Sequence, residues 1–260
     1  MITRTGLLGM LPALLLAVTG CRSEPAARGP GNAERATEVT VFAASSLTDA
    51  FAELAEDYRR TEPGVSRVTF NFAGSQQLAG QILQGAPADV LASASPASMD
   101  LVIEAGVASA QPATFAGNAL TIAVESGNPQ SIGELADLAD PRLKVVLAAA
   151  QVPAGQYAAE ALAGAGVTVH PVSLENDVRA VVSKVALGEA DAGVVYATDV
   201  AAAEPDVEGV MIPEGANVIA SYPIVTLADA PNPSGAAAFV NFVRSRRGQR
   251  ILVGHGFRRP

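Results

Sequence analysis

The sequence has a single cysteine, no tryptophan, two histidines and only two lysines. One cysteine can supply neither a disulfide framework nor a thiolate metal site. His170 and His255 stand far apart without a neighbouring ligand pattern, and we interpret both as structural. Asp89, Asp191 and Asp199 lie beside predicted strand ends, where a carboxylate cation site is conceivable, but helix caps and turn residues are the preferred interpretation. The sequence therefore gives no clear signal for a metal centre.

Catalytic signatures are also missing. The sequence contains no nucleophile-elbow serine motif, no phosphate-loop lysine motif, no paired-histidine zinc motif and no glycine-rich dinucleotide fingerprint. A secreted hydrolase or transferase with Ser46 as nucleophile is the remaining enzyme hypothesis. Such an enzyme needs a histidine base, and neither histidine lies in a predicted strand-end loop beside Ser46. Nothing in the sequence therefore indicates catalysis.

Positive charge is in short supply. The chain carries 17 basic and 26 acidic residues, for a formal net charge of −9. Removal of residues 1–20 would delete one base, Arg4, and no acid, so the charge would go from −9 to −10. An acidic protein of this kind is a poor candidate for nucleic-acid binding. If the ligand is an anion, local dipoles must hold it, because the overall field opposes its approach.

The N-terminus reads as a targeting segment. Arg4 precedes an apolar stretch, Gly6 to Val18, which is too short for a stable membrane span and is typical of a signal peptide. Val18-Thr-Gly-Cys21 then resembles the bacterial lipoprotein box, in which the cysteine is lipidated and becomes the mature N-terminus. We predict a lipoprotein signal peptide in residues 1–20 with lipidation at Cys21. A plain secretory signal with a chance cysteine is the alternative.

Residues 21–37 are rich in Ala, Gly, Arg and Pro, and are predicted to form a flexible tether. The globular part is organised around the stretch that follows. Val39, Val41 and Phe42 predict a buried strand, which ends at two serines, Ser45 and Ser46. Apolar residues then recur at helical spacing, at Leu47, Ala50, Phe51, Leu54, Ala55 and Tyr58.

Ser45 or Ser46 is therefore the predicted N-cap of this helix, with Asp49 in its first turn. A strand that ends in small residues and opens a helix presents free backbone N–H groups at the carboxyl edge of a sheet. Open α/β folds bind ligands at that edge, and anions bind there without a positive side chain. An ordinary capped helix is the alternative, so a functional interpretation needs further loops of this kind.

Two more such units follow. Val68–Phe72 alternates like a strand and leads into a helix that starts at Ser75. Ala88–Ser93 is a third predicted strand, and a helix follows from Pro96. Residues 39–117 thus predict a βαβαβα lobe.

After Asn118 the alternation of strands and helices begins again. Strands are predicted at Ala119–Val124, Lys144–Ala149, Thr168–Pro171, Ala190–Tyr196, Val207–Ile212 and Asn217–Ala228. Helices are predicted at Ser131–Leu138, at Pro233–Arg247 and in the tail from Gly248 to Phe257. Three further helices are predicted to begin at Pro153, after a cap at Asn176 and at Ala197. The pattern predicts an α/β fold of two lobes, residues 39–117 plus 224–260 and residues 118–223, which close on a ligand between them.

Six short motifs become informative together, because they occur in the order and spacing of one family. The chain resembles the periplasmic molybdate-binding proteins, the substrate-binding subunits of ABC-type molybdate importers, over residues 39–258. The motifs are Val-Phe-Ala-Ala-Ser45-Ser46-Leu-Thr-Asp-Ala, Phe-Ala-Gly-Ser75, Gly-Ala-Pro-Ala-Asp89, Val-Pro-Ala154-Gly-Gln-Tyr, Asp-Val178-Arg and Gly-Val-Val-Tyr196. The resemblance implies a periplasmic-binding-protein-like fold of type II with the ligand cleft between the lobes.

The resemblance also implies a site. In that family a tetrahedral molybdate or tungstate ion is held between the lobes by hydrogen bonds alone. Carried onto this chain, Ser46 and Ser75 would each donate through hydroxyl and backbone N–H, Ala154 and Val178 through backbone N–H, and Tyr196 through its phenol. No cofactor other than the oxyanion ligand is implied.

Two positions depart from the family pattern. Ser45 replaces the alanine commonly found before the key serine, which leaves open whether Ser45 also contacts the ligand. Gly74 stands where some members have serine, and this difference is expected to change loop flexibility more than contacts.

The physics of the implied site is consistent. A dianion in a dry cleft needs donors, and hydrogen bonds to a charged group contribute about 1.5–3 kcal/mol each. Fixed neutral donors favour a fully deprotonated oxyanion, and a rigid cavity can separate molybdate from the smaller sulfate. The resemblance implies an extracytoplasmic, lipid-anchored or periplasmic monomer that works with an ABC-type permease and its ATPase.

Other ligands remain alternatives. Sulfate and phosphate are tetrahedral oxyanions of the same kind. Ferric iron is disfavoured because iron receptors usually need tyrosine pairs or carboxylates, and the four tyrosines of this chain are nowhere adjacent; they are Tyr58, Tyr157, Tyr196 and Tyr222.

Overall fold

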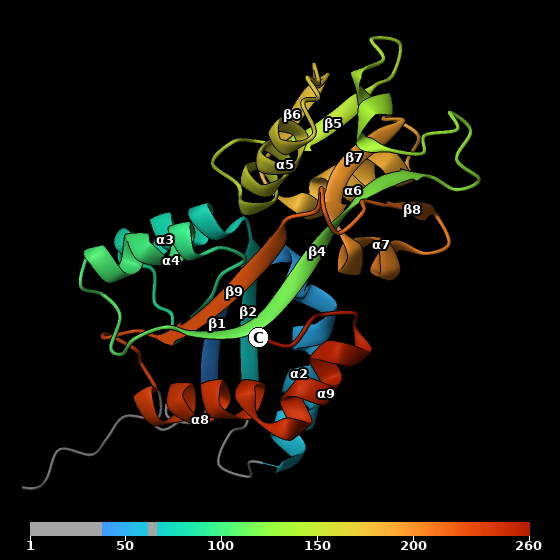
Figure 1. The fold of residues 1–260 in the computed structure, drawn as a ribbon. Coiled ribbons are helices and arrows are strands. Elements are labelled where there is room, and N and C mark those ends of the chain that lie inside the picture. Colours follow the sequence, from blue (N-terminus) through green and yellow to red (C-terminus); the bar gives the residue numbers. More distant parts are fainter. Residues whose placement is uncertain (1–37, 62–66) are drawn as a thin grey trace, which may run out of the picture.

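The computed structural model describes residues 38–61 and 67–260 (Figure 1). The described residues form one curled sheet of nine strands in the order β2-β1-β3-β9-β4-β7-β5-β6, with β8 paired to β4. Helices cover both faces, so the predicted α/β class is confirmed. The signal peptide, the tether and Cys21 lie outside the described residues. Within the described part, no helix is long and apolar enough to cross a membrane.

The first lobe holds the serine-bearing loops. Its strands are β1 (Glu38–Ala44), β2 (Arg67–Ala73) and β3 (Val90–Ala92), and its helices are η1 (Ser45–Leu47), α2 (Thr48–Thr61), α3 (Ser75–Leu83), α4 (Pro96–Glu104), α8 (Pro233–Arg244) and α9 (Arg246–Gly254). Strand β1 lies parallel to β2 and β3. Helices α3 and α4 pack on one face of the sheet, and α2, α8 and α9 lie on the other (Figure 1).

The second lobe repeats the arrangement on a smaller scale. Its strands are β5 (Val145–Ala148), β6 (Ser173–Glu175), β7 (Ala192–Tyr196) and β8 (Val207–Met211), and its helices are η2 (Leu135–Ala139), α5 (Pro153–Gly164), α6 (Val178–Ala186) and α7 (Ala197–Ala203). Strand β5 lies parallel to β6 and β7. Parallel strands place their carboxyl ends, and the helix starts that follow them, at one edge of the sheet.

Two long strands, β4 (Ala113–Glu125) and β9 (Ile219–Thr226), run between the lobes (Figure 1). The first part of β4, up to Ala119, pairs with β9, and from Leu120 onward it pairs with β7 and β8. One strand therefore belongs to both halves of the sheet and changes partner in its middle. The predicted lobe boundaries at 117/118 and 223/224 fall within these two strands, and the division itself stays a prediction.

Local sequence explains most elements. The apolar stripe predicted for α2 is buried, with Phe51, Leu54 and Tyr58 fully enclosed. Phe51 and Tyr58 meet Phe239 of α8 with ring centroids 6.1 and 5.4 Å apart, and Phe51 also meets Phe115 of β4 at 5.8 Å. These aromatic contacts join α2, α8 and β4 around one core.

Four predicted elements are wrong in their extent. The helix predicted over Ser131–Leu138 is reduced to η2, because the Asn128 side chain bonds both backbone polar groups of Ile132 and Ser131 has a φ of 53°. The strand predicted over Thr168–Pro171 lies at Ser173–Glu175 instead. Pro171 has no N–H for a ladder, and pairing with β5 starts from the N–H of Val172.

The helix predicted over Pro233–Arg247 is also divided. It ends at Arg244, and Ser245 adopts extended backbone and caps α9 by accepting a hydrogen bond from the N–H of Gly248 at 3.2 Å. Strand β4 begins at Ala113 rather than at the predicted Ala119. The extra length is the part of β4 that pairs with β9 in the first lobe.

Candidate functional site

A small cavity lies between the lobes, and all five predicted site residues line it. Its lining combines loop and helix-start residues of both lobes: Ala44, Ser45, Ser46, Ala73, Gly74, Ser75, Ala94, Val152, Pro153, Ala154, Val178 and Tyr196. The five predicted residues are each at most 4% exposed, so the lobes are closed over the space. Ser45 also lines the cavity, which makes it a neighbour of the predicted site.

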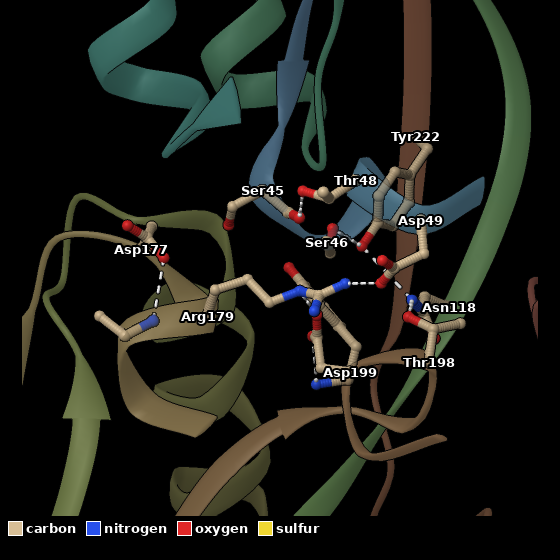
Figure 2. Close-up of polar contacts among 12 residues, drawn as sticks. Ser45, Ser46, Thr48, Asp49, Asn118, Asp177, Arg179, Thr198, Asp199 and Tyr222 are labelled. Carbon is tan, nitrogen blue, oxygen red and sulfur yellow. Dashed lines mark hydrogen bonds and ion pairs between the residues drawn. The ribbon is translucent and has the colours of Figure 1, made fainter. Parts of the chain in front are cut away.

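The first lobe contributes two serines whose hydroxyl oxygens already have partners. Ser75 is the first residue of α3, and its Oγ accepts a hydrogen bond from the backbone N–H of Ala94 at 2.9 Å. The Ser75 hydrogen is therefore free to point elsewhere. Ser46 lies in η1, and its Oγ is 2.9 Å from the Oη of Tyr222 (Figure 2).

The predicted capping by Ser45 or Ser46 is wrong. The N-cap position before η1 falls at Ala44, and no side chain there caps the helix. The Ser46 hydroxyl bonds to Tyr222 instead, and the carbonyl of Ser45 accepts a hydrogen bond from Thr48 Oγ1 at 2.7 Å. Asp49 does lie in the first turn of α2, as predicted.

The second lobe contributes backbone donors. Ala154 follows Pro153 in the first turn of α5, and Val178 is the first residue of α6. The leading N–H groups of a helix have no acceptor within it, so such positions present donors. The predicted cap Asn176 is wrong by one residue, because Asp177 Oδ1 accepts from the N–H of Ala180 at 3.0 Å.

Tyr196 ends β7 and is 1% exposed. Its hydroxyl has no hydrogen-bond partner among the described residues. Burial, with Tyr222 nearby, raises the pKa of Tyr196 well above its usual value. The phenol therefore keeps its hydrogen and is available as a donor.

The electrostatics of the cavity suit an anion. The starts of η1, α3, α5 and α6 all contribute lining residues, and helix starts carry partial positive charge. Of the described residues that line the cavity, none is charged. A cation would find no compensating carboxylate there, whereas an anion would find amides, hydroxyls and a phenol.

Several contacts hold the lobes together around the cavity. Arg179 of α6 forms an ion pair with Asp49 of α2 (Figure 2). Gln76 of α3 donates through Nε2 to the carbonyl of Asn176 at 3.2 Å. Both contacts join the two lobes at the rim of the same cavity.

Gly74 is part of this closure, and the expectation that it affects flexibility more than contacts is wrong. A Cβ at Gly74 would lie 2.5 Å from the backbone oxygen of Asn176 and 2.6 Å from the side chain of Gln76. The position has an ordinary φ of −60°, so close approach, not backbone conformation, requires the glycine.

Arg179 also reaches a buried carboxylate. Its Nε lies 3.4 Å from Asp199, which is fully buried and accepts a hydrogen bond from the N–H of Tyr196 at 3.3 Å. Burial raises the pKa of Asp199 to about 7, and Arg179 counteracts part of that rise. Figure 2 shows the guanidinium group of Arg179 between Asp49 and Asp199.

The other candidate ligands for a cation bind backbone amides. Asp89 accepts from the N–H groups of Thr40 and Asn232 at 2.7 and 2.6 Å, and Asp191 accepts from Lys144 at 2.6 Å. The described residues contain no group of three or more His, Cys, Asp or Glu side chains that could hold a metal ion. Neither histidine lines the cavity.

Sequence reasoning missed three residues at the site. Tyr222 and Asn118 stand behind Ser46, and Arg179 bridges the lobes. Tyr222 and Asn118 lie on the two strands that run between the lobes, β9 and β4. Arg179 follows directly after Val178 in a quoted motif.

Comparison with known proteins places this geometry in context. A family model of bacterial extracellular solute-binding proteins matches residues 39–258. A molybdate-binding protein of Mycobacterium tuberculosis is 41% identical over 254 residues, which are 97% of each chain.

Two solved structures share the fold. The sulfate-binding protein of Mycobacterium tuberculosis matches with a TM-score of 0.78 at 20% identity, over 86% of this chain and 87% of that one. The periplasmic molybdate-binding protein of Azotobacter vinelandii matches with a TM-score of 0.75 at 20% identity, over 85% of this chain and 99% of that one. The predicted periplasmic-binding-protein-like fold is confirmed, and the fold alone does not distinguish the two ligands.

Proposed function

The chain belongs to the bacterial extracellular solute-binding proteins, and from this membership we propose that it captures molybdate, and also tungstate, outside the cytoplasm. It then delivers the ion to an ABC-type permease and its ATPase. The observation that carries the proposal is the closed, uncharged cavity at the starts of four helical segments, lined by Ser46, Ser75, Ala154, Val178 and Tyr196.

The chemistry of the lining supports an oxyanion. Two hydroxyls, the leading amides of helices and one phenol can each donate a hydrogen bond to a ligand that consists of acceptors on its outside. Burial of a dianion without such donors would cost many kcal/mol. Because the donors are neutral, they cannot easily supply a proton, and this favours an ion that is fully deprotonated.

The choice of molybdate over sulfate rests on sequence rather than on fold. The relative with 41% identity is named for molybdate, whereas the solved sulfate-binding protein shares 20% identity. Sulfate, or phosphate, is therefore the second candidate. Molybdate has longer bonds from its central atom to oxygen, so a rigid cavity that fits it would hold sulfate loosely.

Isothermal titration calorimetry of the purified protein with molybdate, tungstate, sulfate and phosphate tests the proposal. Tight one-to-one binding of molybdate and tungstate is expected, with little heat from the other two. Tight sulfate or phosphate binding would keep the receptor function and reassign its ligand. No binding of any of the four would contradict the proposal.

We propose that the protein is a receptor and not an enzyme. Support comes from the family membership and from the position of both histidines away from the cavity, which leaves Ser46 without a histidine base. A serine-directed phosphonate probe is expected to leave the protein unmodified. Covalent labelling of Ser46 would overturn this part of the proposal.

We also propose that residues 1–20 are removed, that Cys21 is lipidated and that residues 21–37 tether a monomeric receptor to the membrane. The lipoprotein-box sequence before Cys21 supports this proposal. The mature protein is expected in the membrane fraction with a lipid-modified N-terminal cysteine by mass spectrometry. Cys21→Ser should release the protein, and an unchanged membrane fraction for that variant would refute the anchor.

A further inference from the structure

The two serine hydroxyls of the cavity are held in different ways. Ser75 Oγ accepts from a backbone N–H, that of Ala94, so its own hydrogen can only point away from that bond. Ser46 Oγ has a hydroxyl partner, Tyr222 Oη at 2.9 Å, and either oxygen can be the donor. Whether Ser46 offers a hydrogen to the cavity therefore depends on Tyr222.

A third residue sets the direction of this pair. Asn118 Nδ2 lies 2.7 Å from Thr198 Oγ1 and 3.4 Å from Tyr222 Oη. An amide nitrogen only donates, so the Tyr222 oxygen receives a hydrogen from Asn118 and its own hydrogen is available for Ser46. In this amide orientation Asn118 Oδ1 is buried without a hydrogen-bond partner among the described residues.

The resulting chain of donors is dry and rigid. Asn118 and Tyr222 are fully buried, and Ser46 is 4% exposed, so water does not compete for the hydroxyls. The Tyr222 ring is held edge-on by Phe115 and Phe257, with ring centroids 6.3 and 5.5 Å away. Figure 2 shows the Tyr222 hydroxyl directed at Ser46 from the strand β9.

We propose that Tyr222 is a positioning residue that makes Ser46 an obligate hydrogen donor, so that the site selects oxyanions without a hydrogen atom. Tyr222 does not line the cavity and acts only through Ser46. With both serine oxygens already accepting one hydrogen bond each, only one lone pair is left on each of them for an anion that carries a hydrogen. This inference rests on the proposed oxyanion-binding function and adds the source of its selectivity.

A double-mutant cycle tests the proposal, because it separates an effect through Ser46 from a general structural effect. Molybdate affinity is measured for wild type, Tyr222→Phe, Ser46→Ala and the double variant. Tyr222→Phe is expected to weaken binding about tenfold, the scale of one hydrogen bond. In the Ser46→Ala background the same substitution should change affinity by less than about twofold.

Selectivity gives an independent readout. Tyr222→Phe frees a second lone pair of Ser46 Oγ and lets the hydroxyl rotate, so the ratio of hydrogen phosphate to molybdate dissociation constants should fall about tenfold. Tyr58→Phe is the matched control, because it removes a phenol hydroxyl from a buried residue of α2 in the first lobe. This control should leave both the affinity and the ratio unchanged.

The outcomes distinguish a failure of the proposed function from a failure of the role proposed for Tyr222. If wild type binds none of the tested oxyanions, the proposed function fails and this inference fails with it. If wild type binds but Tyr222→Phe is neutral, or weakens binding equally in both backgrounds, only the role of Tyr222 is refuted. If Tyr222→Phe does not fold, Asn118→Leu removes the donor to Tyr222 and must show the same dependence on Ser46.

Discussion

The two walls of the cavity are built on different principles. In the first lobe, Ser46 and Ser75 are the predicted hydroxyl donors, and their oxygens are bonded to Tyr222 and to the Ala94 amide. In the second lobe, the predicted donors are helix-start amides and the phenol of Tyr196, which has no partner among the described residues. In the first wall both hydroxyl oxygens therefore have partners within the protein, whereas the phenol of the second wall has none among the described residues.

This difference couples closure to binding. A buried hydroxyl without a partner costs about 1–3 kcal/mol. An anion that accepts a hydrogen bond from Tyr196 would remove this cost, so binding is expected to favour the closed arrangement. A closed form favoured in this way would distinguish the loaded receptor from the unloaded one for the proposed permease.

The largest expected effect comes from the two serines of the first wall, whose oxygens already have hydrogen-bond partners. Ser46→Ala combined with Ser75→Ala removes two donors to the anion, each contributing about 1.5–3 kcal/mol. Molybdate binding by calorimetry should weaken roughly 10²–10⁴-fold while circular dichroism remains that of the folded protein. Unchanged affinity in a folded double variant would show that neither serine contacts the ligand.

Tyr196→Phe tests the other wall and should have a smaller effect. Loss of one phenol donor is expected to weaken binding by about 1.5–3 kcal/mol, roughly ten- to a hundredfold. Because the lost hydroxyl is buried without a partner, the melting temperature of the ligand-free protein should stay constant or rise. Ser75→Ala is the matched contrast, since it leaves the Ala94 N–H without its acceptor and should lower that temperature. Equal shifts for the two variants would contradict the comparison.

Gly74→Ser should affect the approach of the walls rather than their donors. Its Cβ would meet the Asn176 carbonyl at 2.5 Å, so the lobes must shift slightly apart. A cost of about 1 kcal/mol, or roughly fivefold in affinity, is expected from the crowding. Gly80→Ala, in the same helix with open space around it, should bind normally. Wild-type affinity for Gly74→Ser would mean that binding does not require this close approach.

The buried carboxylate behind Tyr196 gives a pH dependence. The pKa of Asp199 is raised from 3.8 to about 7, first by burial and also by Asp177 and Asp49, while Arg179 opposes the rise. Because the folded pKa is the higher one, the contribution of Asp199 to stability is complete below about pH 4. It is lost as the pH rises through about 7.

Unfolding measurements check this sign. Between pH 4 and 7, wild type should lose up to about 1.4 kcal/mol per pH unit more than Asp199→Asn. Asp206→Asn, at an exposed carboxylate of the same lobe, is the control and should keep the wild-type slope. A wild-type slope in Asp199→Asn would mean that the carboxyl of Asp199 titrates normally.

Ligand binding should also depend on the Asp199 carboxyl, and this is the smallest of the predicted effects. A bound dianion raises the pKa of Asp199 further, so binding near pH 7 is expected to take up protons. Calorimetry in two buffers of different ionisation enthalpy measures that uptake. Asp199→Asn should abolish it, and uptake that persists in the variant must come from another group.

The sequence predicted the fold class because its signals are local. Apolar residues at helical spacing, such as Phe51 and Leu54, define a buried face wherever the helix packs. The five site residues were chosen as a set through resemblance, and the structure gathers them around one cavity. Their role as ligand donors stays a prediction. The misplaced elements failed for local reasons too, as with Pro171, which cannot donate to a strand ladder.

The missed residues act over long separations. Tyr222 meets Ser46 across 176 residues, Arg179 meets Asp49 across 130, and Asn118 meets Thr198 across 80. A local sequence pattern does not indicate which side chain of a distant strand will contact the residues of a loop. The Ser46 hydroxyl bonds to the distant Tyr222 instead of capping its own helix. The local rule for helix capping therefore failed at this position.

The absence of charge from the cavity lining has a kinetic consequence. The chain as a whole is strongly negative, with a formal charge of −9, so an arriving dianion is repelled at a distance. Salt screens that repulsion beyond about 8 Å at physiological ionic strength, but it does not screen short hydrogen bonds in a closed cavity. Added salt should therefore speed association and leave dissociation unchanged. The affinity for the anion would therefore increase with salt concentration. At a site built from lysine and arginine the affinity would decrease instead.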